Sequence, residues 1–294
     1  MASDLVESAP AKVNLTLRVL GRRADGYHDI ESLVVFAEIG DRLTLTPGDA
    51  LALSAGGPRA AQSGAEADNL VLTAARALAA CVPGLHVGAF GLEKNLPVAA
   101  GLGGGSADAA AALRLLARVN ELPLDDPRLA QAARATGADV PVCLDPRPRM
   151  MRGIGEILSA PLALPRLPAL LVNPGVAVPT RLVFAEWRPS ANPVAGLAAA
   201  ADFAGSVSGV SEHQLLEWLA REGNDLEMPA TVLAPPIADV LASLRGLAGC
   251  RLARMSGSGA TCFALFSSAA QAAAAGSDLR ARFPDWWISE TVLG

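Results

Sequence analysis

The segment at residues 97–107 has the composition of a phosphate-binding loop. Glycine lets backbone N–H groups come close to an anion, and a helix behind the loop would add unpaired N–H groups and a favourable dipole. Ser106 adds a hydroxyl that could contact a phosphate or Mg²⁺, or could cap the helix instead. A tight turn is the structural alternative for the whole segment. The loop consists of Pro97, Val98, Ala99, Ala100, Gly101, Leu102, Gly103, Gly104, Gly105, Ser106 and Ala107.

Two familiar phosphate-binding motifs do not fit this loop. A P-loop requires a lysine directly after its glycines, and none follows here. The dinucleotide-binding pattern of Rossmann folds places a glycine where this chain has Ser106. The loop therefore predicts phosphate binding on another scaffold.

Lysine is rare in this chain. Of 24 basic residues only Lys12 and Lys94 are lysine, which leaves 22 arginines. A compact ammonium suits a crowded site beside a phosphate better than a broad guanidinium. Lys12 lies in residues 11–20, where apolar and polar residues alternate as in a half-buried strand, and this period places Lys12 and Asn14 on one face, about 7 Å apart. A lysine that only reaches from an edge strand to solvent is the alternative.

The elements around these residues alternate between strand and helix. The glycine loop is expected to join a strand at residues 85–93 to a helix from about Ser106 to Val119. Further helices are predicted at residues 68–80 with Asp68 as cap, 127–135, 180–186, 211–220 and 237–247. Further strands are predicted at residues 30–39, 42–46, 169–173, 251–255 and 261–266.

Prolines concentrate between residues 145 and 168 and mark a domain junction. The sequence therefore predicts two domains, residues 1–160 and 161–294. Residues 192–210 are rich in alanine, glycine and serine and predict a mobile connection within the second domain.

Six segments, in this order, resemble the motifs of the GHMP kinases, the family of galactokinase, homoserine kinase, mevalonate kinase and phosphomevalonate kinase. The resemblance implies an α+β, two-domain GHMP kinase fold with the active site in the cleft between the domains. It also implies an ATP-dependent kinase that phosphorylates a small-molecule alcohol, with Mg²⁺ accompanying ATP. The segments are AKVNL at residues 11–15, DGYH at 25–28, DNL at 68–70, the glycine loop, GADVP at 137–141 and SGSG at 256–259.

The resemblance implies a role for each matching residue on the ATP side. Asp139 would be the base that takes the proton from the acceptor hydroxyl, and Lys12 would orient it and stabilise charge near the γ-phosphate; a helix cap before Pro141 is the structural alternative for Asp139. Asp108, in the first helical turn, would repel a triphosphate unless it turned away or shared Mg²⁺. The adenine would lie near Asn69, Leu70, Lys94 and Asn95.

The set is most similar to the member whose acceptor carries a cytidyl diphosphate and which acts in the non-mevalonate route to isoprenoid precursors, on the C2 hydroxyl of a methylerythritol. The similarity implies that Tyr27 and His28 hold the cytosine ring by stacking and hydrogen bonding. The alternatives are a purely structural Tyr-His pair, a core role for Phe184, and a plain hairpin turn at the second glycine loop, which comprises residues 255–261. The other implied substrate residues are Asn14, Thr180, Phe184, Gly257, Ser258 and Gly259.

Composition excludes several other classes. A net charge of −5 argues against a general nucleic-acid binder, because such proteins neutralise many phosphates with a basic surface. Every apolar stretch is interrupted before it reaches membrane-spanning length, and acidic Asp4 and Glu7 stand where a signal peptide needs positive charge. The four cysteines show no metal-ligand spacing and indicate buried thiols in a reducing compartment. We therefore expect a cytoplasmic enzyme without a membrane or nucleic-acid partner.

Two other functions fit the same motifs. Another GHMP kinase, of the homoserine or mevalonate type, would share the loops, although the Tyr27-His28 segment favours the cytidyl substrate. A catalytically silent nucleotide-binding regulator would share the scaffold, although the presence of both Lys12 and Asp139 disfavours it. Monomer and homodimer are both compatible with the sequence.

Overall fold

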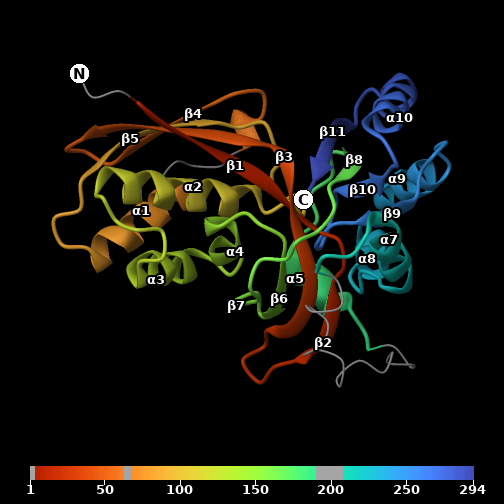
Figure 1. The fold of residues 1–294 in the computed structure, drawn as a ribbon, viewed down its shortest axis with the longest axis horizontal. Coiled ribbons are helices and arrows are strands. Elements are labelled where there is room, and N and C mark those ends of the chain that lie inside the picture. Colours follow the sequence, from red (N-terminus) through yellow and green to blue (C-terminus); the bar gives the residue numbers. More distant parts are fainter. Residues whose placement is uncertain (1–3, 63–67, 190–207) are drawn as a thin grey trace. The chain divides into compact units, whose positions relative to one another are not determined.

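A computed structural model describes residues 4–62, 68–189 and 208–294 of the chain (Figure 1). The connection predicted at residues 192–210 lies almost wholly outside these ranges. Two compact units are present, and both are assembled from separate stretches of sequence. Unit 1 contains Met1–Lys12, Ile39–Val98 and Gly103–Pro146, and unit 2 contains Val13–Glu38, Ala99–Leu102 and Arg147–Gly294.

The described helices of unit 1 lie on one side of its strands (Figure 1). The second half of strand β3 (His28–Gly48) pairs antiparallel with β5 (Val87–Glu93), and β4 (Ala52–Gly56) pairs parallel with β5. The first part of β1 (Leu5–Asn14) also belongs to this unit. The helices are α1 (Leu70–Cys81), α2 (Gly104–Val119), α3 (Pro127–Thr136) and α4 (Val140–Leu144), and a short 3₁₀ turn lies at Ala60–Gln62.

Helix α2 is the buried centre of unit 1. Its run of alanines is almost fully buried, because the missing side-chain bulk lets neighbouring helices approach closely. The buried Arg114 of α2 donates hydrogen bonds to the backbone oxygens of Ser8 (2.7 Å) and Cys143 (2.7 Å) and pairs with Glu7. One guanidinium thus ties β1 and α4 to α2, and fixes the helix behind the glycine loop.

Unit 2 is built on antiparallel strands. Strands β11 (Trp287–Leu293), β8 (Leu167–Asn173), β10 (Cys262–Leu265) and β9 (Leu252–Met255) are neighbours in that order. The first half of β3 pairs with β2 (Arg18–Arg22) and β6 (Arg149–Gly153), and β6 pairs with β7 (Ile157–Leu158). Among the residues that the structure describes, its helices are α5 (Thr180–Glu186), α7 (Glu212–Arg221), α8 (Glu227–Leu233), α9 (Pro236–Arg245) and α10 (Ala269–Arg282).

The half-buried strand predicted at residues 11–20 is wrong in two respects. Strand β1 ends at Asn14 and β2 begins only at Arg18, because Leu17 bridges to Asn224 instead. Its polar side is also covered: Lys12, Asn14 and Thr16 are 4%, 1% and 3% exposed. Buried polar groups need partners, so these side chains mark places where this segment is bonded to distant parts of the chain.

Smaller differences concern element boundaries. Helix α1 is capped by Asn69, whose Oδ1 accepts a hydrogen bond from the Val71 N–H (3.0 Å), and not by Asp68. Residues 30–39 and 42–46 belong to one continuous strand, β3. Helix α8 had no predicted counterpart. In the described parts of the chain, no helix is both long and apolar enough to cross a membrane.

Candidate active site

The glycine loop ends in the N-terminus of α2, two residues earlier than predicted. Gly103 is the N-cap residue, in the left-handed region at φ +61°, so Ser106 lies inside the helix and is not its cap. A side chain at each of three successive glycines would meet a predicted site residue: Lys12 from Gly103 (3.2 Å), Lys94 from Gly104 (3.2 Å) and Leu70 from Gly105 (3.4 Å). Glycine here allows both lysines to approach the loop closely.

Lys12 forms an ion pair with Asp139. The Nζ of Lys12 lies 3.1 Å from Oδ2 of Asp139, and the Asp139 side chain is 37% exposed. Asp139 occupies the N-cap position of α4 but makes no capping hydrogen bond. Its carboxylate is therefore directed to Lys12 and open to a ligand, which fits a group that exchanges a proton with a bound alcohol.

Lys94 lies in a buried cluster with two carboxylates. Its ammonium contacts Asp41 Oδ2 and lies 2.7 Å from Asp108 Oδ2. Asp41 also accepts hydrogen bonds from the N–H groups of Asn95 (2.6 Å) and Leu96 (2.8 Å) through Oδ1. Asp108 therefore turns into the protein, toward Lys94.

The cluster carries one positive and two potential negative charges. Burial raises the pKa of the Asp108 carboxyl to about 7; Lys94 opposes this rise and the nearby Asp41 adds to it. Burial alone would lower the pKa of Lys94, but the two carboxylates outweigh it and raise that pKa. Oδ1 of Asp108 has no hydrogen-bond partner among the described residues. An unpartnered buried oxygen is costly when charged, so protonation of Asp108 relieves the cluster.

We expect Asp108→Asn to change how stability depends on pH. In the folded protein the pKa of Asp108 is raised from 3.8 to about 7. The protonated side chain therefore contributes to the free energy of unfolding fully below pH 3.8, and this contribution is lost as the pH rises through 7. The free energy of unfolding of the unmodified protein should therefore fall relative to the variant, by up to roughly 1.4 kcal/mol per pH unit between pH 5 and 7. Urea unfolding at pH 5 to 8.5 measures this difference. Parallel curves would contradict it, and the exposed Asp278→Asn serves as control.

The middle of the glycine loop, Ala99–Leu102, belongs to unit 2 and contacts the second glycine loop there. Gly101 is in the left-handed region at φ +74°, and a Cβ on it would collide with the backbone oxygens of Ser256 and Gly259. Ser256 Oγ donates to the Gly101 oxygen (2.8 Å), and the Thr261 N–H donates to the Ala100 oxygen (3.0 Å). The predicted loop between β9 and β10 is confirmed, and it packs closely on the first loop.

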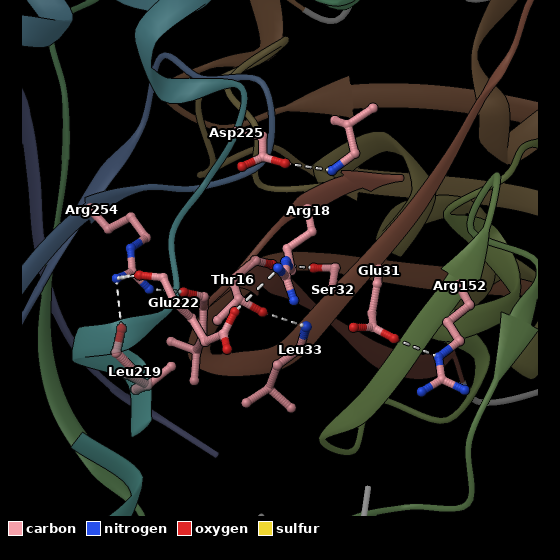
Figure 2. Close-up of polar contacts among 12 residues, drawn as sticks. Thr16, Arg18, Glu31, Ser32, Leu33, Arg152, Leu219, Glu222, Asp225 and Arg254 are labelled. Atoms are coloured by element: carbon pink, nitrogen blue, oxygen red, sulfur yellow. Dashed lines mark hydrogen bonds and ion pairs between the residues drawn. The ribbon is translucent and has the colours of Figure 1, made fainter. Parts of the chain in front are cut away.

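Asn14 lies beside this second loop. Its backbone N–H donates to Ser256 Oγ (3.1 Å), and its side-chain amide donates to Ser32 Oγ (2.7 Å). Ser32 in turn donates to the Thr16 backbone oxygen, and Thr16 Oγ1 accepts from the Leu33 N–H (3.0 Å), as Figure 2 shows. This chain of hydrogen bonds fixes the Asn14 side chain, whose Oδ1 faces Gly257.

Three residues that follow α7 in the sequence hydrogen-bond to the second glycine loop or to residues 15–19. The sequence had not predicted them. Asn224 donates to the backbone oxygens of Met255 (2.8 Å) and Gly257 (2.7 Å), on both sides of the loop's first turn. Asp225 accepts from the Val19 N–H, and the buried Arg254 donates to the oxygens of Leu15, Leu219 and Glu222 (Figure 2). Each of these residues bonds to backbone groups that are distant in sequence, so no local sequence pattern could predict its role.

His28 belongs to an aromatic group of three side chains, with Phe184 and Trp187. Its ring stacks on Phe184, with centroids 4.9 Å apart and 23° between planes, and meets the edge of Trp187 at 5.8 Å. Tyr27 is 60% exposed. Burial, and then the nearby Arg22, lower the pKa of His28, which favours a neutral ring that can donate at one nitrogen and accept at the other. This arrangement can hold a flat, neutral ring such as a nucleobase.

Other predicted substrate residues also come together in unit 2. The hydroxyls of Thr180 and Ser258 are 2.8 Å apart. Thr180 and Phe184 both lie on α5, so the same helix reaches the second glycine loop and the aromatic group. Two residues predicted to lie near an adenine bond to the backbone instead. Asn69 Oδ1 caps α1 by accepting from the Val71 N–H, and the Asn95 amide donates to the Gly40 oxygen.

Comparison with known sequences places the chain in a kinase family. Residues 69–145 match the family described as GHMP kinases N terminal domain, and residues 206–285 match GHMP kinases C terminal. The chain belongs to the GHMP kinases, which are ATP-dependent phosphotransferases acting on small molecules.

Individual relatives within this family share one particular enzyme name. The chain is 58% identical to 4-diphosphocytidyl-2-C-methyl-D-erythritol kinase of Methylobacterium radiotolerans, over 98% of this chain and 99% of the relative. The kinase of that name from Bradyrhizobium diazoefficiens is 55% identical over 98% of each chain.

Solved structures agree with the family. A crystal structure of 4-(cytidine 5'-diphospho)-2C-methyl-D-erythritol kinase matches with a TM-score of 0.76 at 35% identity, over 99% of each chain. Homoserine kinase from Cytophaga hutchinsonii matches with a TM-score of 0.73 at 21% identity, over 99% of this chain and 95% of that one, which supports the shared fold only. The predicted GHMP kinase fold is confirmed.

Proposed function

We propose that this chain transfers the γ-phosphoryl group of ATP to the C2 hydroxyl of 4-diphosphocytidyl-2-C-methyl-D-erythritol, in the non-mevalonate route to isoprenoid precursors. Two relatives that are 55 and 58% identical over 98% of this chain are named 4-diphosphocytidyl-2-C-methyl-D-erythritol kinase. The observation that carries the choice of acceptor is the aromatic group of His28, Phe184 and Trp187 beside the exposed Tyr27. A cytosine is flat, neutral at pH 7 and rich in hydrogen-bonding edges, and so matches this group.

The Lys12–Asp139 pair supports the chemical step. The Asp139 carboxylate takes the proton of the acceptor hydroxyl while the hydroxyl oxygen forms a bond to the γ-phosphorus. The bond from that phosphorus to the oxygen bridging it to the β-phosphate breaks, and ADP leaves with the electron pair. The Lys12 ammonium holds Asp139 in place and offsets the negative charge that gathers around the transferred group.

The backbone of the glycine loop is proposed to receive the phosphates. Helix α2 is sixteen residues long, and its first N–H groups directly follow Gly103, its N-cap residue in the loop. The proposed nucleotide residues gather around this end: Leu70 lies against Gly105, and Asn69 caps the neighbouring helix α1.

Mg²⁺ is proposed to arrive with ATP. Among the described residues no group of three or more histidine, cysteine, aspartate or glutamate side chains could hold a metal ion. Mg²⁺ at such sites keeps water and phosphate oxygens among its ligands, and the Ser106 hydroxyl at the start of α2 is the protein ligand that we propose. When bound, the ion neutralises charge on the β- and γ-phosphates.

A coupled ADP-release assay against a panel of alcohols tests the acceptor. The panel contains 4-diphosphocytidyl-2-C-methyl-D-erythritol, methylerythritol phosphate without the cytidyl group, homoserine and mevalonate. We expect turnover only with the first. Equal turnover of the compound without the cytidyl group would refute the proposed acceptor, and no turnover of any alcohol would favour a silent regulator.

We expect Tyr27→Ala to raise the KM of the cytidyl acceptor by about tenfold or more, because a stacked aromatic face contributes roughly 1 to 3 kcal/mol. The KM of ATP should stay within about twofold of the unmodified value. Steady-state kinetics with each substrate varied in turn measure both, and Tyr27→Phe, which keeps the ring, is the control. An unchanged acceptor KM in Tyr27→Ala would refute the stacking role.

We also propose that the enzyme works in the cytoplasm. All four cysteines, Cys81, Cys143, Cys250 and Cys262, are free thiols, which supports a reducing compartment.

A further inference from the structure

Lys94 contacts the glycine loop, yet neither its ammonium nor its partners reach solvent. The side chains of Lys94, Asp41 and Asp108 are 4%, 0% and 3% exposed. Lys12 is equally buried, but its partner Asp139 is 37% exposed and so opens toward a ligand. The two lysines of the chain therefore sit in different surroundings, although both touch the N-terminus of α2.

The buried cluster connects the two ends of the glycine loop. Lys94 directly follows β5, and Asp41 binds the N–H groups of the next two residues, Asn95 and Leu96. Asp108 is the fifth residue of α2 and directly follows the loop. A single ammonium thus joins the residues that enter the loop to the helix that leaves it.

We propose that Lys94 is a positioning residue that acts through Asp41 and Asp108 to hold the glycine loop in the shape that receives the phosphates, and that its side chain does not contact the nucleotide. The proposal rests on ATP binding, which the family establishes, and not on the identity of the acceptor. It therefore stands or falls separately from the proposed acceptor.

The space around Lys94 explains why this position is lysine in a chain that otherwise uses arginine. A Cβ at Gly104 would already lie 3.2 Å from the Lys94 Nζ, and the backbone there begins α2. A guanidinium is wider than an ammonium and needs a planar arrangement of partners. Lys94→Arg should therefore press on Gly104 and displace the first turn of the helix.

Binding of three ligands distinguishes positioning from direct contact. We expect Lys94→Arg to weaken binding of ATP and of inorganic triphosphate by about tenfold or more, because phosphate sites tolerate little displacement. Binding of adenosine should change less than about twofold. The measurement is calorimetry for ATP and triphosphate, and competition against a fluorescent ATP analogue for adenosine.

Two results would overturn the proposal. Equal losses for adenosine and ATP would mean that Lys94 contacts the base, and unchanged binding of all three ligands would mean that the cluster does not shape the loop.

A pair of variants at Asp108 keeps the test decisive if Lys94→Arg fails to fold. Asp108→Asn retains an oxygen acceptor for Lys94 and should keep the affinity for ATP within about threefold, whereas Asp108→Leu removes the acceptor and should reproduce the loss for ATP and triphosphate. Far-ultraviolet circular dichroism confirms that both variants are folded. A folded Asp108→Leu protein that binds ATP with unmodified affinity would contradict the proposal.

Discussion

Replacement of Asp139 by asparagine should lower kcat by about 10² to 10⁴ while ATP binding is retained. Asparagine has nearly the same shape and still offers an oxygen to Lys12, so the ion-pair geometry of 3.1 Å can survive as a hydrogen bond. It cannot accept a proton from an alcohol. Because Asp139 makes no capping hydrogen bond to α4, the substitution should leave the helix intact.

Steady-state kinetics together with calorimetric titration of ATP separate these effects. The expected pattern is a large fall in kcat, a small change in acceptor KM and an ATP affinity that is unchanged or tighter, since one negative charge has been removed from the site. The exposed Asp125→Asn is a control in the same unit and should stay within about twofold in kcat. A fully active Asp139→Asn enzyme would exclude Asp139 as the base.

The sequence predicted the parts of the site that lie in local motifs. The glycine loop joins a strand to a helix as expected, and the second loop lies between β9 and β10. The scarcity of lysine also proved informative, because Lys12 and Lys94 both contact the N-terminus of α2. The loop and the helix behind it could be predicted because both are set by adjacent residues, whereas the lysines were singled out by composition alone.

The groups that hold these motifs in place could not be predicted in the same way. Asp41 lies within a long strand and binds residues 54 and 55 positions later, and Asn14 and Ser256 are 242 positions apart. Alternation of polar and apolar residues predicted an open face at residues 11–20, but that face is buried against such distant partners. Periodicity reports which side of a strand a residue takes and not what later covers it.

Asp108 illustrates the same limit for electrostatics. Its place in the first turns of α2 left two alternatives open, a side chain turned away from the triphosphate or one shared with Mg²⁺. The side chain turns to Lys94 and is almost fully buried. The direction depends on Asp41 and Lys94, which come from other elements. Only the folded arrangement gives this carboxyl its pKa of about 7.

Gly101→Ala should be among the most damaging single substitutions in the chain. An added Cβ would lie 2.9 Å from the Gly259 oxygen and closer still to the Ser256 oxygen, and both are backbone atoms that cannot rotate away. The left-handed φ of +74° adds strain of its own. We expect the free energy of unfolding to fall by about 3 kcal/mol or more, and kcat/KM for ATP to fall by about 10², because both glycine loops must shift.

Gly84→Ala separates the collision from the backbone strain. Gly84 has nearly the same φ, +77°, but no atom lies within 4 Å of a Cβ built there, so only the strain of about 1 to 2 kcal/mol should remain. Urea unfolding and ATP kinetics on both variants give the comparison. Equal losses in the two would mean that the contact between the loops is not tight. A larger loss in Gly101→Ala, accompanied by lower activity, would instead tie the close contact of Gly101 with Ser256 and Gly259 to phosphate binding.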